Sequence, residues 1–181
     1  MLARALLYPD RLKIEPRAVL ACLLSALALT AVLAPAPAQA RGSARLDGVE
    51  RKIVGKINAI RAGYGLPRLL VNRRLARSAD YHSRDMLRAN FFAHSSSNGQ
   101  SMQRRVKSFR RSKRIGETLA YVRGRSSGRS ARRIVRMWMN SPPHRASLLN
   151  PGFRRVGVAR RTGRLGRGRA TVFTADFASR R

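Results

Sequence analysis

The chain is poor in cysteine and in acidic residues. Only Cys22 among its 181 residues is a cysteine, and only eight residues are Asp or Glu. Cys22 lies within an apolar run near the N-terminus, and cleavage after that run would leave a chain without thiols. Disulfides and thiol redox chemistry are then excluded. A domain of about 140 residues buries enough apolar surface to fold without such cross-links.

The N-terminus has the pattern of a secretory leader. A basic segment precedes an apolar run from Ala18 to Ala34, and an A-x-A pattern follows at Ala38 and Ala40. This order is typical of a cleavable signal peptide. The run is short for a membrane span, and a retained anchor is the alternative. We therefore predict a signal peptide over residues 1–40, a short linker over 41–45, and one domain over 46–181.

The shortage of acidic residues leaves a formal net charge of +31. Residues 1–40 hold four basic and two acidic side chains, so the remainder carries about +29, nearly all of it arginine. Such a field attracts polyanions. For an exported monomer we expect anionic envelope polymers or lipids as partners. No aromatic residues alternate with the arginines, so nucleic acid is expected to bind only nonspecifically.

Several motifs of enzymes are missing from the sequence. It contains no G-x-G-x-x-G, no P-loop and no H-E-x-x-H, which argues against dinucleotide, nucleotide and zincin-type sites. Ser95 follows His94, and Ser141 lies near His144, but neither serine is in a nucleophile elbow. A serine hydrolase is therefore disfavoured.

Apolar spacing predicts helices in the first part of the domain. Residues Leu46 to Ile60 repeat at intervals of three and four, as on one face of an amphipathic helix. Asn72 is a good N-cap for a second helix, and Ser101 and Ser130 are candidate caps for two more. Pro142 and the proline after it should end the last of these helices.

The second part of the domain changes period. Gly116 to Val122 is predicted to be a turn that enters an extended segment. Val156 and Val158 alternate with polar or small residues, and so do Phe173 to Phe177, which predicts half-buried strands joined by a glycine-rich loop across 161–169. Helices followed by paired strands indicate an α+β domain.

Three short segments contain the candidate site residues His94, Glu117 and His144. Imidazole is a metal ligand, and a carboxylate can orient it or accept a proton. The three residues are far apart in the sequence and can meet only through the fold. They are the catalytic candidates, with His94 and His144 as metal ligands together with Glu117; a purely structural network uses the same residue types. His82, on the apolar stripe of the second helix, is expected to be a core histidine satisfied by a hydrogen bond.

The same segments resemble the CAP superfamily, named for cysteine-rich secretory proteins, antigen-five and pathogenesis-related proteins, and especially its bacterial SCP-like branch. The resemblance rests on F-F-A-H-S, G-E-T-L-A, W-M-N-S-P-P-H-R and F-T-A-D-F, in this order along the chain. It implies an α-β-α sandwich with a small antiparallel sheet between helices. It also implies a cleft lined by two histidines and two acidic residues, which in some members binds a divalent metal such as zinc.

The resemblance assigns the cleft histidines and one acidic residue to His94, Glu117 and His144. The second acidic position is Ser141, and Thr118 replaces the usual asparagine, so a mechanism with two carboxylates is weakened. Ser95, Trp138 and Ser141 are expected to line the cleft.

Two functions of different kinds follow. One is a secreted, envelope-associated binding module for lipids, other small hydrophobic ligands or anionic polymers. The other is a metal-dependent hydrolase, in which His94 and His144 hold zinc with an open position and Glu117 acts as base or orienting group.

Overall fold

The computed structural model describes residues 46–125 and 129–180. The predicted signal peptide and linker lie outside these residues. Within them, no helix combines the length and the apolar character needed to cross a membrane. The helices are α1 (Gly48–Gly63), α2 (Arg73–Arg88), α3 (Met102–Phe109), α4 (Ser130–Asn140) and α5 (Pro142–Leu148). The strands are β1 (Leu70–Val71), β2 (Ile115–Arg123), β3 (Arg155–Leu165) and β4 (Gly168–Ala178).

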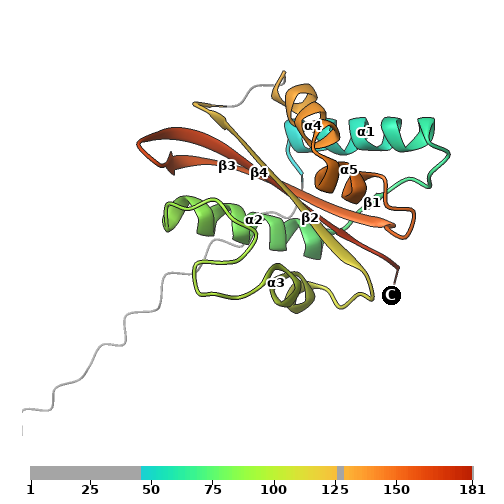
Figure 1. Cartoon of the computed structure of the whole chain (residues 1–181), viewed down its shortest axis with the longest axis horizontal. Coiled ribbons are helices and arrows are strands. Elements are labelled where there is room, and N and C mark those ends of the chain that lie inside the picture. Colours follow the sequence, from blue (N-terminus) through green and yellow to red (C-terminus); the bar gives the residue numbers. More distant parts are fainter. Residues whose placement is uncertain (1–45, 126–128, 181) are drawn as a thin grey trace, which may run out of the picture. The chain divides into compact units, whose positions relative to one another are not determined.

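The four strands form one sheet with helices on both faces. The strand order is β1-β3-β4-β2. β4 is antiparallel to both of its neighbours, whereas the short β1 is parallel to β3. α2 and α3 cover one face, and α1, α4 and α5 cover the other (Figure 1). The predicted α-β-α sandwich is confirmed, with β1 making the sheet mixed.

The helix starts follow from local capping. Asp47 accepts hydrogen bonds from two backbone N–H groups of α1 and forms a capping box with Glu50. Asn72 and Ser101 cap α2 and α3 through their side chains, as predicted. The prediction for Ser130 was wrong: it is the first residue of α4, and the preceding Arg129 makes no side-chain cap.

The prolines after α4 have a second role. Pro142 and Pro143 lie just beyond Asn140, the last residue of α4, as predicted, and they also begin α5, a helix that was not predicted. Proline is tolerated in the first helical turn because the N–H that it lacks would have no partner inside the helix. α5 is important for the site because it contains His144.

The strand prediction failed in its estimate of burial. From Ala170 to Ala178 every residue of β4 is buried, although a half-buried strand was expected. β4 lies between β3 and β2, and the helix layers cover both of its faces. The loop was also overestimated: β3 runs to Leu165 and pairs with β4 through a tight turn in which Gly166 has φ of 62°. A positive φ favours glycine there.

The largest hydrophobic cluster lies between the sheet and the layer of α1, α4 and α5. Its fully buried members include Ile53, Ile57, Trp138, Phe173 and Phe177. Burial of one such side chain stabilises the fold by about 1.5–3 kcal/mol. The opposite face of the sheet carries the polar residues of the site.

Candidate functional site

The loop between α2 and α3 carries His94 and is fixed at several points. Nε2 of the buried His82 lies 2.8 Å from the carbonyl oxygen of Ala93. The Asp85 carboxylate accepts hydrogen bonds from the backbone N–H and the hydroxyl of Ser97, at 2.9 and 2.6 Å. These contacts tie the loop to α2 on both sides of His94, so its position is set by buried groups. The expected hydrogen bond of His82 is confirmed.

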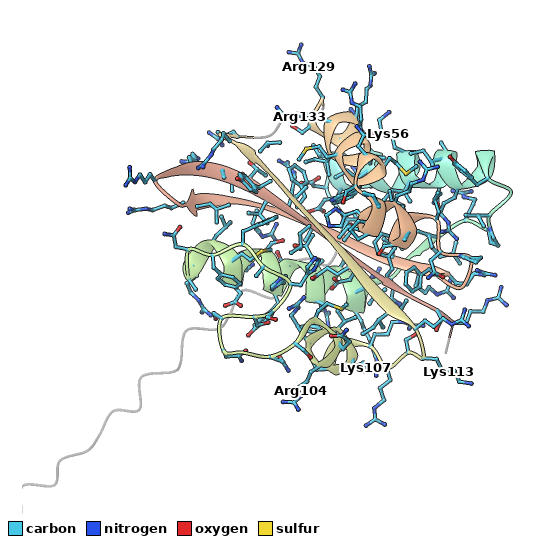
Figure 2. All side chains as sticks on the ribbon, viewed as in Figure 1. Lys56, Arg104, Lys107, Lys113, Arg129 and Arg133 are labelled. Atoms are coloured by element: carbon cyan, nitrogen blue, oxygen red, sulfur yellow. The ribbon has the colours of Figure 1, made fainter. Side chains whose placement is uncertain are left out.

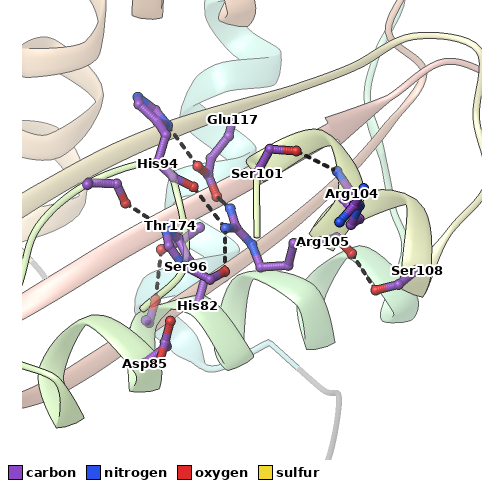
Figure 3. A network of polar contacts seen from close by, with 12 residues as sticks. His82, Asp85, His94, Ser96, Ser101, Arg104, Arg105, Ser108, Glu117 and Thr174 are labelled. Carbon is purple, nitrogen blue, oxygen red and sulfur yellow. Dashed lines mark hydrogen bonds and ion pairs between the residues drawn. The ribbon is translucent and has the colours of Figure 1, made fainter. Parts of the chain in front are cut away.

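Arg105 joins this loop to the sheet. Its side chain is fully buried, and one of its nitrogens donates to the carbonyl oxygen of His94 at 2.8 Å and to Ser96 Oγ at 3.1 Å. The other terminal nitrogen lies 2.5 Å from Glu117 Oε2 on β2 (Figure 3). The planar guanidinium donates hydrogen bonds in fixed directions, so a buried arginine holds the carboxylate and the neutral acceptors around it in defined positions. Arg105 therefore fixes the backbone of His94 relative to Glu117.

Glu117 also holds the imidazole of His94. The His94 Nδ1 atom lies 2.7 Å from Glu117 Oε1 (Figure 3). Burial and the nearby Arg105 guanidinium lower the pKa of His94, so the imidazole is neutral at pH 7. A neutral ring that donates from Nδ1 to a carboxylate leaves Nε2 free to accept a hydrogen bond. About half of the His94 side chain is exposed, which makes this nitrogen accessible.

His144 completes a pair of imidazoles. The ring centroids of His94 and His144 are 6.3 Å apart, tilted by 55°. Burial, and the neighbouring His94, lower the pKa of His144. Both rings are therefore neutral at pH 7. The structure brings together His94, Glu117 and His144, which come from a loop, a strand and a short helix.

A second carboxyl group lies beside Glu117. Asp176 is directly opposite Glu117 in the register of β2 and β4, and it is completely buried. Burial raises the pKa of Asp176 well above its ordinary value, and the negative charge of Glu117 raises it further. Burial also raises the pKa of Glu117, against the opposing effect of Arg105. Two adjacent carboxyl groups cannot both ionise readily in such a site. Arg105 favours the charge on Glu117, whereas burial favours the protonated form of Asp176.

Arg105 and Asp176 were not among the predicted site residues. Asp176 occupies a polar position in an alternating strand, and such positions were assigned to the exposed face of a half-buried strand. An aspartate within a run of apolar strand residues is unusual, and that was the available signal. Arg105 had no signal, because arginines are abundant throughout this chain.

The predicted cleft residues occupy different environments. Ser95 is exposed and Ser141 is partly buried, at the junction of α4 and α5. Trp138 is fully buried in the core, where its indole N–H donates to the carbonyl oxygen of Leu119 at 3.0 Å. The cleft itself stays a prediction, because the basic pockets described below are lined by other residues.

The donor set does not match a zinc site held by protein ligands. Catalytic zinc uses three protein ligands, and across residues 46–125 and 129–180 no group of three His, Cys, Asp or Glu side chains is arranged to hold a metal ion. Glu117 is engaged with Arg105 and with His94 Nδ1, so two imidazoles remain. We derive no catalytic step through a metal.

The remaining chemistry is that of a histidine oriented by a carboxylate. Such a pair can accept a proton. Hydrolysis through a nucleophile needs a hydroxyl within reach of the imidazole, and no serine hydroxyl in the described part of the chain hydrogen bonds to His94 or His144.

The titration of His82 gives a prediction for acid stability. Burial, together with Arg105, lowers its pKa from 6.5 to about 4. The unfolded chain then binds more protons than the folded one between these two pH values, so stability is lost as the pH falls through this window. As the pH falls through this window, the free energy of unfolding of the wild type should decrease by on the order of 3 kcal/mol more than that of His82→Gln, whose side chain cannot titrate. Urea unfolding at a series of pH values measures this, and parallel curves for the two proteins would contradict it.

The fold and the site together define a three-layer α-β-α domain with paired histidines, one of them oriented by a buried carboxylate. The sequence profile of the CAP family, described as the cysteine-rich secretory protein family, matches residues 54–177. The chain belongs to this family.

Three relatives show how far the similarity extends. Uncharacterized protein YkwD of Bacillus subtilis is 36% identical over 135 residues, which are 71% of this chain and 51% of that protein. An outer surface protein of Borrelia burgdorferi is 21% identical with a TM-score of 0.62, covering 74% of this chain and 93% of that one. An extracellular SCP-domain protein of Bacillus anthracis is 28% identical with a TM-score of 0.59, covering 74% and 41%. This chain thus spans about half of YkwD.

Proposed function

We propose that this protein is an extracellular CAP-domain binding module that its positive surface holds to anionic polymers or lipids of the cell envelope. The observation that carries the proposal is the distribution of charge. The chain has a formal charge of +31 and only eight acidic residues. Six of these lie in the described residues, and each is either paired or buried.

The paired carboxylates stabilise the fold and leave the surface cations uncompensated. Asp47 pairs with Arg160, and Asp80 pairs with Arg84 and Arg161. Asp85 caps the His94 loop. The other three carboxyl groups, Glu50, Glu117 and Asp176, are buried. Arg61 and Arg105 are buried, but most of the other arginines are exposed with few negative neighbours, and such a field concentrates polyanions at the surface.

The extracellular setting is supported by the predicted signal peptide and by the relatives. One relative is named an outer surface protein and another an extracellular protein. Neither name identifies a ligand. The neutral His94 and His144 would then act as a second contact region, for uncharged polar groups of a bound ligand.

Co-sedimentation with lipid vesicles tests the proposal. We expect the full chain to pellet with vesicles of phosphatidylglycerol and not with vesicles of phosphatidylcholine. Pelleting should decrease steeply as salt shortens the Debye length below about 10 Å. His94→Ala separates charge from the second contact region, because it removes an imidazole without changing the surface charge, and it should pellet with phosphatidylglycerol vesicles as the wild type does. Equal pelleting with both vesicles, or binding that is independent of salt, would overturn the proposal.

A further inference from the structure

One groove concentrates the surface cations. It lies between α1 and α4, next to the end of β2, and has a volume of about 1180 Å³. Eight of its twelve lining residues are Arg or Lys, and no acidic residue lines it. The cations are Lys52, Lys56, Arg123, Arg125, Arg129, Arg132, Arg133 and Arg136.

The groove cations are available to a ligand. Seven of the eight are exposed, and Lys56 is half-buried. None of them forms an ion pair with a carboxylate in the described part of the chain. Arg123 alone is anchored, through a hydrogen bond from its guanidinium to the Leu165 carbonyl oxygen at 3.0 Å. The groove therefore presents an array of like charges that are held close together without counter-charges, which favours an anionic occupant.

The two helices give the groove two charged walls. Lys52 and Lys56 lie one turn apart on α1, with Gly55 and Ala59 on the same stripe. A Cβ added at Gly55 would meet no atom within 4 Å, so space is open there. On the other wall Arg129, Arg133 and Arg136 recur at helical spacing, about one turn or 5.4 Å apart. Ser130 begins α4 at the groove, which adds the positive end of the helix dipole.

We propose that this groove is a binding site for a linear phosphodiester polymer with uncharged, non-aromatic repeats. The inference rests on the proposed function and assigns its site and ligand class. A phosphodiester has its charge in the polymer backbone, and its two non-bridging oxygens diverge, so two cations can donate to the same group. Arginine forks match such oxygens well. No aromatic side chain lines the groove, so it offers no platform on which bases could stack.

A charge-matched pair of variants separates the groove from net charge. The groove variant is Lys56→Glu with Arg129→Glu and Arg133→Glu. The control variant is Arg104→Glu with Lys107→Glu and Lys113→Glu, which belong to the basic pocket beside α3. The two sets lie on opposite sides of the sheet (Figure 2). Each variant changes the net charge by the same amount, and none of the six cations forms an ion pair within the described residues.

Calorimetric titration of the full chain with a glycerol-phosphate oligomer is the measurement. We expect the groove variant to bind at least about tenfold more weakly than the control variant, which corresponds to loss of several phosphate contacts. Equal losses in the two variants would overturn the groove while leaving the proposed function intact. Absence of binding to both the oligomer and anionic vesicles would overturn both.

A neutral substitution tests the shape of the groove. Gly55→Leu adds a side chain to the α1 wall of the groove without altering any charge, and leucine favours the helix more than glycine does. We expect binding of the oligomer to weaken several-fold while the circular dichroism spectrum is unchanged. Unchanged binding would show that the polymer does not enter the groove.

Tighter binding of a single-stranded oligonucleotide or of polyglutamate with the same number of charges would overturn the assignment to a phosphodiester without bases.

Discussion

Gly157→Ala is expected to destabilise the fold by about 4 kcal/mol or more, a loss that few single substitutions reach. Gly157 lies on β3 where the strand passes under α2. A Cβ added there would lie 2.0 Å from the backbone nitrogen of Ala76 and 2.2 Å from the carbonyl carbon of Leu75. Backbone atoms cannot move aside as a flexible side chain can, so strand and helix must separate. Urea unfolding of the wild type and the variant measures the loss.

Gly55→Ala is the matched control for this substitution. It also adds one methyl group, but at a helical position with no atom within 4 Å. We expect stabilisation by about 0.5–1 kcal/mol, since alanine loses less backbone entropy than glycine in a helix. A free energy of unfolding of Gly157→Ala within about 1 kcal/mol of the wild-type value would contradict the close packing of β3 on α2.

Removal of the Glu117 carboxylate is expected to have the second largest effect. Glu117→Ala leaves the buried Arg105 guanidinium without its charge partner, and breaking a buried ion pair in this way costs about 3–5 kcal/mol. It also frees the imidazole of His94, which loses its hydrogen bond from Nδ1. We expect a lower free energy of unfolding together with altered imidazole resonances of His94 in NMR spectra.

Two comparisons show whether burial of the ion pair is the reason for the loss of stability. Arg84→Ala breaks the exposed Arg84–Asp80 pair, which should change stability by about 1 kcal/mol or less. Glu117→Leu combined with Arg105→Met removes both buried charges. The loss of stability in this double variant should be smaller than the sum of the losses in the two single variants. Additive effects in this double-mutant cycle would contradict the buried pair.

The helices α1 to α4 and two of the caps could be predicted because their signals are local, whereas α5 was missed. Asn72 and Ser101 precede apolar residues at helical spacing, and both cap helices in the structure. An extended segment ending near Val122 was also predicted and is part of β2, but Gly116, expected in a turn, already belongs to the strand. Ser130 failed as a cap because a serine before an apolar stripe serves equally well as the first helical residue, and the sequence does not distinguish the two.

Features that depend on tertiary packing were harder to predict. The burial of β4 depends on its position between β3 and β2, which alternation within one strand does not reveal. β1 has only two residues, both exposed, and no pattern of its own. The site was predicted in part for the same reason. His94, Glu117 and His144 stood out as rare residue types. Asp176 offered only the weak signal of an aspartate among apolar strand residues, and Arg105 becomes notable only when the sheet and the loop are seen to enclose it.

The most direct test of the account is the salt dependence of binding between the full chain and a glycerol-phosphate oligomer. If about six groove cations contact phosphates, the logarithm of the association constant should fall against the logarithm of the salt concentration with a slope of about −4. The groove variant should bind more weakly and with a shallower slope. A wild-type slope near zero would contradict the account, because binding would then not depend on the cationic surface.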